Sequence, residues 1–347
     1  MQRAVAAPAE GTVARNRYSW LFPTWLLLFY SGWLSLVVAG NLWHLLAGHW
    51  PIAVAMMLGS FVAGSTPMGG GTIGFPVLVL LLGEAPSLGR DFSFAIQSIG
   101  MTSASIYILS TRKPIAADML LAACTGSAIG TPLGILFLAP QIPGPLITVL
   151  FAVVWASFGI LTLRYIRQLT ARTHLRQGYR RLNWCLGGAV GFLGGMLVAS
   201  VTGVGVDMLL YCVLVLVRQA DLRVAVPTSV ILMAFTSLVG VTTLKVTGQM
   251  PAGVFPHWLA AAPIVAVGAP FGAWVAGRLD RRRLLGWVAF ICLLQFVFTY
   301  WQRWDDLGVS GLLLGLLGLA LFQWLFRFLG WLGRQLPELP GETGSAA

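Results

Sequence analysis

Long apolar segments alternate with short polar connectors along most of this chain. Each segment holds roughly 17 to 27 residues, which suits an α-helix that crosses a hydrocarbon core of about 30 Å. The segments are 20–46, 92–109, 115–138, 146–165, 224–244, 254–277, 284–300 and 309–329. This pattern predicts an all-α polytopic membrane protein.

Glycine-rich runs interrupt two further apolar stretches. The first run, residues 65–74, contains Gly69, Gly70 and Gly71, and the second, residues 200–207, contains Gly203 and Gly205. We name these runs the first tip and the second tip. A helix break at membrane depth is tolerated only where it is buried in protein or lines a wet cavity. Two breaks in corresponding positions therefore point to a transporter binding site.

Composition agrees with a membrane protein. Mean hydropathy is +0.82, with 57% apolar and 10% charged residues. A net charge of +11 could indicate nucleic-acid binding in a soluble protein. Here the cations gather in short connectors, which is the bias of cytoplasmic loops, so we expect no nucleic-acid partner. They are Arg112, Lys113, Arg164, Arg167, Arg172, Arg176, Arg180, Arg181, Arg278, Arg281, Arg282 and Arg283.

The charge bias also predicts a topology. If the basic linker 168–183 is cytoplasmic, the block 51–83 begins and ends outside, whereas the block 184–217 begins and ends inside. Each block has about 33 residues, too few for two complete spans. We expect two re-entrant helical hairpins with halves of roughly 12 to 16 residues, entering from opposite leaflets so that their tips meet near the midplane.

Weak internal similarity supports a duplication. Gly69 aligns with Gly203 and Gly71 with Gly205 at one constant offset, and the element 130–134 resembles 268–272 at a slightly larger one. We expect two inverted-topology repeats, each a re-entrant hairpin plus three transmembrane helices, with one extra helix at each end. The expected parts are a cytoplasmic amino-terminal segment (1–19), an amino-terminal transmembrane helix (20–47), a first repeat (51–167), a basic cytoplasmic linker (168–183), a second inverted repeat (184–301), a carboxyl-terminal transmembrane helix (308–330) and a flexible tail (331–347).

New helices are expected to start just after the tips, near Ile73 and Val206. Their first N–H groups lack intrahelical partners and their dipoles are positive there, which favours an anion. The alternative is that the glycines only let helices cross closely. Hydroxyls and one amide could add donors, although Ser and Thr also bond back to their own helix. The candidate substrate-binding residues are Ser65, Thr66, Gly69, Gly70, Gly71, Thr72, Ser200, Thr202, Gly203, Gly205, Gln97, Thr102, Thr228 and Ser229.

Asp207 is an ionisable side chain inside the second tip. Such a residue at membrane depth is costly and indicates function by default. It could couple transport to a proton, or bind a cation. Asp also suits a helix amino-terminal cap, and capping does not exclude coupling.

Nothing in the sequence indicates catalysis. The four cysteines, Cys124, Cys185, Cys212 and Cys292, stand alone in apolar surroundings, and the four histidines are scattered. Motifs for hydrolysis, nucleotide binding or zinc are missing. We expect no catalytic residues, no metal and no cofactor.

Three elements resemble the TauE/SafE sulfite exporter family, also called the toluene-sulfonate uptake permeases. These are Gly59 to Gly64 followed by the first tip, residues 226–229 (Val-Pro-Thr-Ser), and the elements 130–134 and 268–272; the resemblance covers roughly 51–300. It implies transport of sulfite, organosulfonates or related organic anions, with proton coupling. Two departures leave room for a substrate other than sulfite: Asp207 in the second tip, and residues 92–95 where a Thr-Ser element is expected.

We therefore expect a secondary transporter of a small anion that works by alternating access at the two tips. It would be a multi-pass protein of the inner or plasma membrane with both termini in the cytoplasm. Its partners would be a small anionic substrate and membrane lipid. The oligomeric state stays open, with a homodimer as one option. An uncoupled anion channel and a membrane structural or assembly protein are the alternatives.

Overall fold

The computed structural model covers Tyr18, residues 20–171 and residues 180–335, and the regular elements in these ranges are all helices. The rest of the predicted segment 1–19, the centre of the predicted linker (172–179) and residues 336–347 of the predicted tail lie outside the described residues. Wide π-helical turns extend α4 to Leu81, α6 to Leu138, α8 to Ala199 and α10 to Val217. The helices are α1 (Leu21–Ala39), α2 (Trp43–Gly48), α3 (Trp50–Ser65), α4 (Gly71–Pro76), α5 (Pro86–Ser110), α6 (Ala117–Leu133), α7 (Gly144–Ala171), α8 (Arg180–Leu193), α9 (Ser200–Thr202), α10 (Val206–Cys212), α11 (Leu222–Val246), α12 (Val254–Val275), α13 (Arg281–Gln302) and α14 (Trp304–Gln335).

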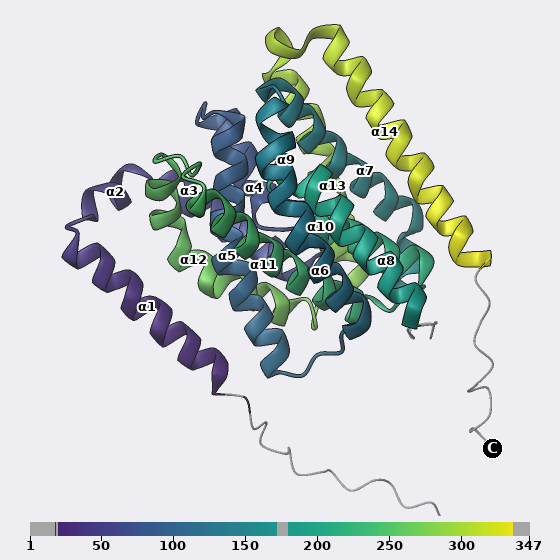
Figure 1. Cartoon of the computed structure of the whole chain (residues 1–347), viewed down its shortest axis with the longest axis horizontal. Coiled ribbons are helices and arrows are strands. Elements are labelled where there is room, and N and C mark those ends of the chain that lie inside the picture. The colour runs from purple at the N-terminus through teal and green to yellow at the C-terminus, as the bar shows by residue number, and fades with distance from the viewer. Residues whose placement is uncertain (1–17, 19, 172–179, 336–347) are drawn as a thin grey trace, which may run out of the picture.

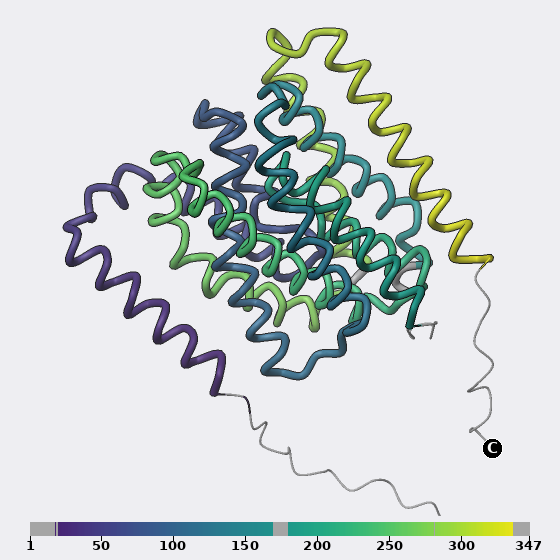
Figure 2. The backbone as a smooth tube through the Cα atoms, viewed as in Figure 1, coloured from purple at the N-terminus to yellow at the C-terminus, as the bar shows by residue number. Residues whose placement is uncertain are grey.

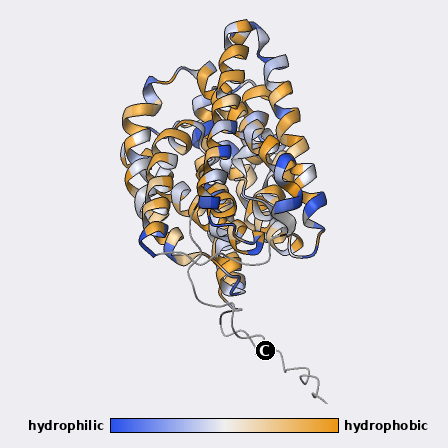
Figure 3. Cartoon of the chain, turned by 90° about the vertical axis from the view of Figure 1, so that its right-hand side faces the viewer, coloured by the Kyte–Doolittle hydropathy of each residue, from blue (hydrophilic) through white to orange (hydrophobic). Residues whose placement is uncertain are grey.

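Within the described ranges, nine helices are long and apolar enough to cross a membrane. Their outward faces are apolar as well (Figure 3). Leu27, Leu28, Trp287, Val297 and Leu317 are each 64–68% exposed. An apolar outer surface suits hydrocarbon and not water. The prediction of an all-α, multi-pass membrane protein is confirmed.

The first and last long helices lie on opposite edges of the bundle (Figures 1 and 2). α1 packs against α5 and α12, and α14 packs mainly against α7. The predicted single helix 20–46 is wrong, because the chain leaves the helix at Gly40 and turns at Asn41, whose φ is +49°. α14 kinks at Gly308 and continues to Gln335, beyond the predicted end at 329.

Both predicted breaks are present, but the arms on either side of them differ in length. The first tip lies between α3, which has 16 residues, and the shorter helix Gly71–Leu81. The second tip lies between the 23-residue helix Arg180–Thr202 and the shorter helix Val206–Val217. The prediction that each arm of a hairpin has 12 to 16 residues is therefore wrong for the first arm of the second hairpin. That helix begins at Arg180, inside the predicted linker, and its π turn at Gly194–Ala199 carries it on to the tip.

The first arm of each hairpin packs against a helix from the other half of the chain. α3 packs along α12, and α8 packs along α6, while α5 lies against α11 and α7 against α13. Glycines let the exchanged arms cross at backbone distance. A Cβ at Gly64 would overlap the Ala269 carbonyl, and one at Gly191 would overlap the Ala123 carbonyl. The two halves are therefore interlocked by equivalent contacts.

Both glycine elements singled out in the sequence lie at these crossings. On α6, Gly130 abuts the backbone of Phe192, and on α12, Gly272 abuts the backbone of Phe61. Small residues in membrane helices allow this close approach and the dispersion contacts that come with it. These glycines serve packing between arms.

A line of aromatic rings centred on α7 joins the helices that follow the two tips. Phe75 of α4 stacks on Phe151 with ring centroids 4.1 Å apart. Trp155 and Phe158 continue the line, and Phe158 meets Tyr211 of α10 at 5.8 Å. All five side chains are fully buried. The helices that follow the two tips, α4 and α10, thus both pack on α7.

Candidate functional site

The centre of the first tip, residues 66–70, is a buried turn between α3 and α4. Thr66 is extended, with φ −139° and ψ 166°, because a residue before proline disfavours the helical region. Pro67 cannot continue the hydrogen-bond ladder. The amide of Thr72 donates to the Gly69 carbonyl and that of Gly74 to the Gly70 carbonyl, at 3.0 and 3.2 Å. The new helix thus starts inside the protein, as predicted.

The second tip needs glycine for its backbone conformation. Gly203 has φ +77° and Gly205 has φ +99°, values that favour glycine strongly. The Gly203 amide donates to the Ala199 carbonyl at 2.7 Å and closes the preceding helix. α10 then begins at Val206. The predicted helix start is confirmed.

The two tips meet against α5. Gln97 Nε2 donates to the Gly203 carbonyl at 2.9 Å and to the Ser93 carbonyl at 2.8 Å. Its Oε1 lies where a Cβ of Gly69 would be. A Cβ at Gly71 would come within 2.7 Å of the Val204 side chain. One buried amide therefore bridges both breaks, and glycine is required where they touch.

Asp207 fills the positive end of α10. Its side chain is fully buried, and Oδ1 accepts from the amides of Met208 at 2.9 Å and Gly205 at 3.2 Å. Oδ2 has no hydrogen-bond partner that meets normal geometry among the described residues. The carboxylate thus satisfies two backbone amides at the start of α10.

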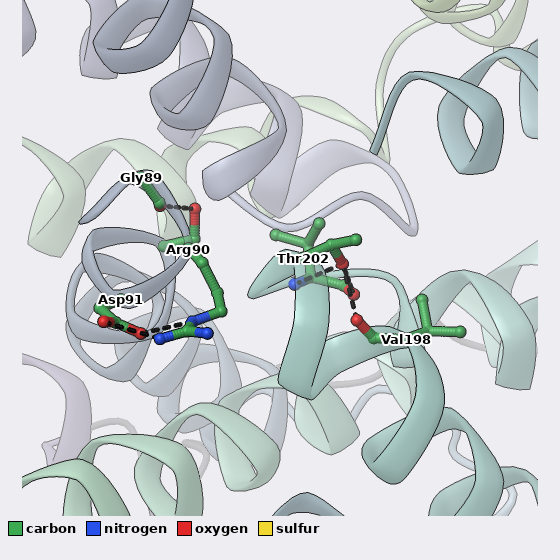
Figure 4. Close-up of polar contacts among 7 residues, drawn as sticks. Gly89, Arg90, Asp91, Val198 and Thr202 are labelled. Carbon is green, nitrogen blue, oxygen red and sulfur yellow. Dashed lines mark hydrogen bonds and ion pairs between the residues drawn. The ribbon is translucent and has the colours of Figure 1, made fainter. Parts of the chain in front are cut away.

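Most of the candidate hydroxyls bond back to their own helices, which is the alternative that the sequence left open. Figure 4 shows Thr202 bonded to Val198 in this way. Thr72 and Thr102 differ, because their hydroxyls are buried without a hydrogen-bond partner within the described ranges. The residues that bond back are Ser65, Thr66, Ser200, Thr202, Thr228 and Ser229.

Not all candidates gather at the tips. Thr228 Oγ1 accepts from the Ala116 amide at 3.0 Å, so it fixes the connector that precedes α6. Ser200 packs against Gly134 of α6. The cluster at the meeting point comprises Gly69, Gly70, Gly71, Thr72, Gln97, Gly203, Gly205 and Asp207.

Sequence reasoning missed three residues in the first turns of α5. Arg90 and Asp91 form a bidentate ion pair, with Nε to Oδ1 at 2.7 Å and Nη2 to Oδ2 at 3.0 Å (Figure 4). Ser93 lies beneath both tips, since Cβ atoms at Gly71 and Gly203 would strike its side chain. The sequence signal for them was the adjacent Arg-Asp pair. Because the predicted span began at Phe92, this pair was assigned to a connector. The pair is buried in the helix instead.

A cavity of about 330 Å³ opens at the end of the bundle that carries the basic connectors. Its lining includes Gly64 and Ser65, where α3 enters the first tip. Lys113 and Arg223 also line it. A path from the basic end therefore reaches the first tip.

Two histidines from distant segments lie together at the other end of the bundle. The rings of His49 and His257 are 4.6 Å apart, and His257 Nε2 is 3.5 Å from Glu84 Oε1. No group of three or more His, Cys, Asp or Glu suited to a metal occurs in the described part of the chain.

A family model described as Sulfite exporter TauE/SafE matches residues 52–299, which include both tips. No curated protein and no solved structure matches the chain.

Proposed function

Since the chain belongs to the TauE/SafE sulfite exporter family, which is a family of membrane transporters and not of enzymes, we propose that it is a secondary transporter of a small sulfur-containing or organic anion. The convergence of the two tips on Gln97 carries this proposal. Two helix amino termini that meet inside an apolar bundle offer backbone donors to an anion without a buried cation. The substrate site is the cluster at the meeting point.

Access alternates between the two ends of the bundle. In this conformation the cavity reaches Ser65 from the basic end, while Val204 packs against Gly71 beyond it. An anion crosses only if that contact opens. The exchanged arms, α3 on α12 and α8 on α6, suit two equivalent hairpins that move against the rest of the bundle. We interpret these hairpins as the inverted repeats expected from the sequence.

Asp207 couples the anion to a proton. An ionised Asp207 about 4 Å from a substrate anion would repel it by roughly 4 kcal/mol at an effective dielectric constant of about 20. Protonation of the carboxylate removes this repulsion and frees the amides of Gly205 and Met208 for the substrate. Anion and proton then bind together and leave together.

The basic connectors orient the protein. Connectors rich in Arg and Lys stay in the cytoplasm. Lys113, Arg223 and Arg278 lie at the ends of helices that surround the cavity. The cavity therefore opens to the cytoplasm, with both termini on that side of an inner or plasma membrane.

Transport in proteoliposomes tests the proposal. Purified protein should accumulate sulfite or benzenesulfonate against its own gradient when a pH gradient is imposed. Flux that only equilibrates the anion would indicate a channel. If neither sulfite nor benzenesulfonate crosses the membrane, with or without the pH gradient, the protein does not transport this substrate class.

A further inference from the structure

The cavity at the basic end is built from five separate parts of the chain. The end of α3, the connector between α5 and α6, the start of α11, the end of α12 and the start of α13 all contribute. Its volume of about 330 Å³ lies at the lower end of the range for sites that enclose small organic molecules, about 300 to 1,000 Å³. A bare sulfite ion would fill only a small part of it.

The walls combine one half-buried cation with apolar side chains. Lys113 lies between the walls, and its Nζ donates to the Ala273 carbonyl at 2.7 Å and rests 5.3 Å from the centre of the Tyr107 ring. The apolar lining includes Ile108, Leu222, Val226 and Leu285. This combination fits a ligand with an acidic head and an apolar body.

No described carboxylate lies within ion-pair distance of Lys113. Two cations lie nearby: Arg223 lines the same cavity, and Arg278 stacks on Trp274 at 3.7 Å. The Asp221 carboxylate, next to the lining residue Leu222, accepts from the Arg223 amide at 2.8 Å. A partly buried ammonium without a counter-charge is costly, so an anion in the cavity would stabilise it. Burial and the neighbouring Arg278 already lower the pKa of the Lys113 amine, as this arrangement requires.

We propose that this cavity is a loading site for an organic anion, whose acidic group binds Lys113 and whose apolar body lies along Ile108, Leu222, Val226 and Leu285. The inference rests on the proposed transport function and adds to it a second site, which distinguishes an organic anion from the bare inorganic ion. Ser65 lines the loading site and belongs to the first tip, so the two sites adjoin. The loading site thus selects organic sulfonates or carboxylates over the bare inorganic ion before the substrate reaches the tips.

Calorimetric titration of the full-length protein in detergent, with benzenesulfonate and sulfite as probes, tests the loading site. We expect benzenesulfonate to bind at least about tenfold more tightly than sulfite. Lys113→Ala should weaken benzenesulfonate by about 10- to 100-fold, the loss expected for one charge-assisted hydrogen bond. Lys113→Arg should keep most of the affinity. Lys245→Ala is the matched control, because Lys245 is an exposed lysine near the other end of α11.

A cavity-filling variant gives an independent readout. Ala276→Phe places a ring in the cavity without touching the charge, and it should abolish benzenesulfonate binding. A thermal unfolding midpoint close to that of the parent protein verifies that the variant is folded. If Ala276→Phe unfolds, Leu285→Ala serves instead and should weaken benzenesulfonate more than sulfite.

Several results would overturn the loading site. Unchanged affinity in Lys113→Ala, or equal loss in Lys245→Ala, would show that Lys113 does not bind the anion. Loss of benzenesulfonate binding in nanodiscs containing phosphatidylglycerol would show that the cavity holds a lipid headgroup. If these failures occur while proteoliposomes still accumulate anion, only the loading site is wrong; if no anion accumulates, the transport proposal fails independently.

Discussion

Gln97 on α5 donates its amide hydrogen to the carbonyl of Gly203, a residue 106 positions later in the chain, at 2.9 Å. The other end of the same amide lies against Gly69 of the first tip. The two helix breaks are thereby held at one point. In the proposed mechanism, substrate passage requires that the Gln97–Gly203 hydrogen bond change.

Replacing Gln97 by Leu should abolish transport and lower stability by about 1 to 3 kcal/mol, because the Gly203 carbonyl loses a buried donor. Gln323→Leu is the control, since Gln323 of α14 donates to the Ser157 carbonyl at 3.1 Å, away from the tips. That variant should lose stability and keep transport. Thermal unfolding and proteoliposome flux measure both effects. Normal flux in Gln97→Leu would show that the bridge has no role in transport.

Asp207→Asn should uncouple transport from protons. The amide keeps the size of the carboxylate and an oxygen that can accept from Gly205 and Met208, but it cannot gain or lose a proton. We expect anion exchange to persist and its dependence on a pH gradient to vanish. Asp306→Asn, a change at an exposed carboxylate paired with Arg303, should behave like the parent protein. Retained pH-gradient dependence in Asp207→Asn would exclude the coupling role.

Alanine at the two arm crossings should destabilise the fold by similar amounts. Gly64→Ala would push a Cβ into the Ala269 carbonyl, and Gly191→Ala would push one into the Ala123 carbonyl. Because backbone cannot yield as a side chain does, we expect each change to cost about 1 to 3 kcal/mol. Gly32→Ala is the control, with open space around the added methyl group. Unfolding midpoints of Gly64→Ala and Gly191→Ala that match Gly32→Ala would contradict the close crossing.

The loading site should depend on pH through Lys113. The pKa of this amine is lowered by burial and by Arg278, so the ammonium loses its proton at a lower pH than a free lysine, whose pKa is about 10.4. Affinity for benzenesulfonate should therefore be full at neutral pH and fall as the pH rises through that lowered value. Lys113→Arg should remove the fall, because arginine stays charged. The charged or titratable groups around Lys113 and the cavity include Tyr107, Asp221, Arg223 and Arg278. A fall that persists in Lys113→Arg would assign the titration to Tyr107, because the arginines stay charged and a carboxyl titrates at acid pH.

Local sequence signals predicted the two tips and most of the spans. Pro67 and the glycines that follow it predict the first break. Gly203 and Gly205 predict the second, because the turn there needs positive φ. Helix lengths were less predictable. The π turn after Leu193 and the helical start at Arg180 leave no periodic signal that separates a half-span from a full one.

Contacts between distant segments could not be read from the sequence. The exchange of arms depends on which glycines face each other, and Gly64 and Ala269 belong to different halves of the chain. The same holds for the cavity, since the sequence showed Lys113 only as one of the cations in the short connectors. Hydroxyl roles were ambiguous because the i−4 carbonyl competes with any substrate.

Anion flux in proteoliposomes carrying Gly71→Leu or Gly205→Leu tests the paired tips most directly, with Gly32→Leu as the control in open space. A side chain at Gly71 would separate the first tip from Ser93 and Val204, and one at Gly205 would strain a residue with φ +99°. We expect all three variants to fold, with flux lost in Gly71→Leu and Gly205→Leu and retained in Gly32→Leu. Parental flux in Gly71→Leu and Gly205→Leu would contradict it.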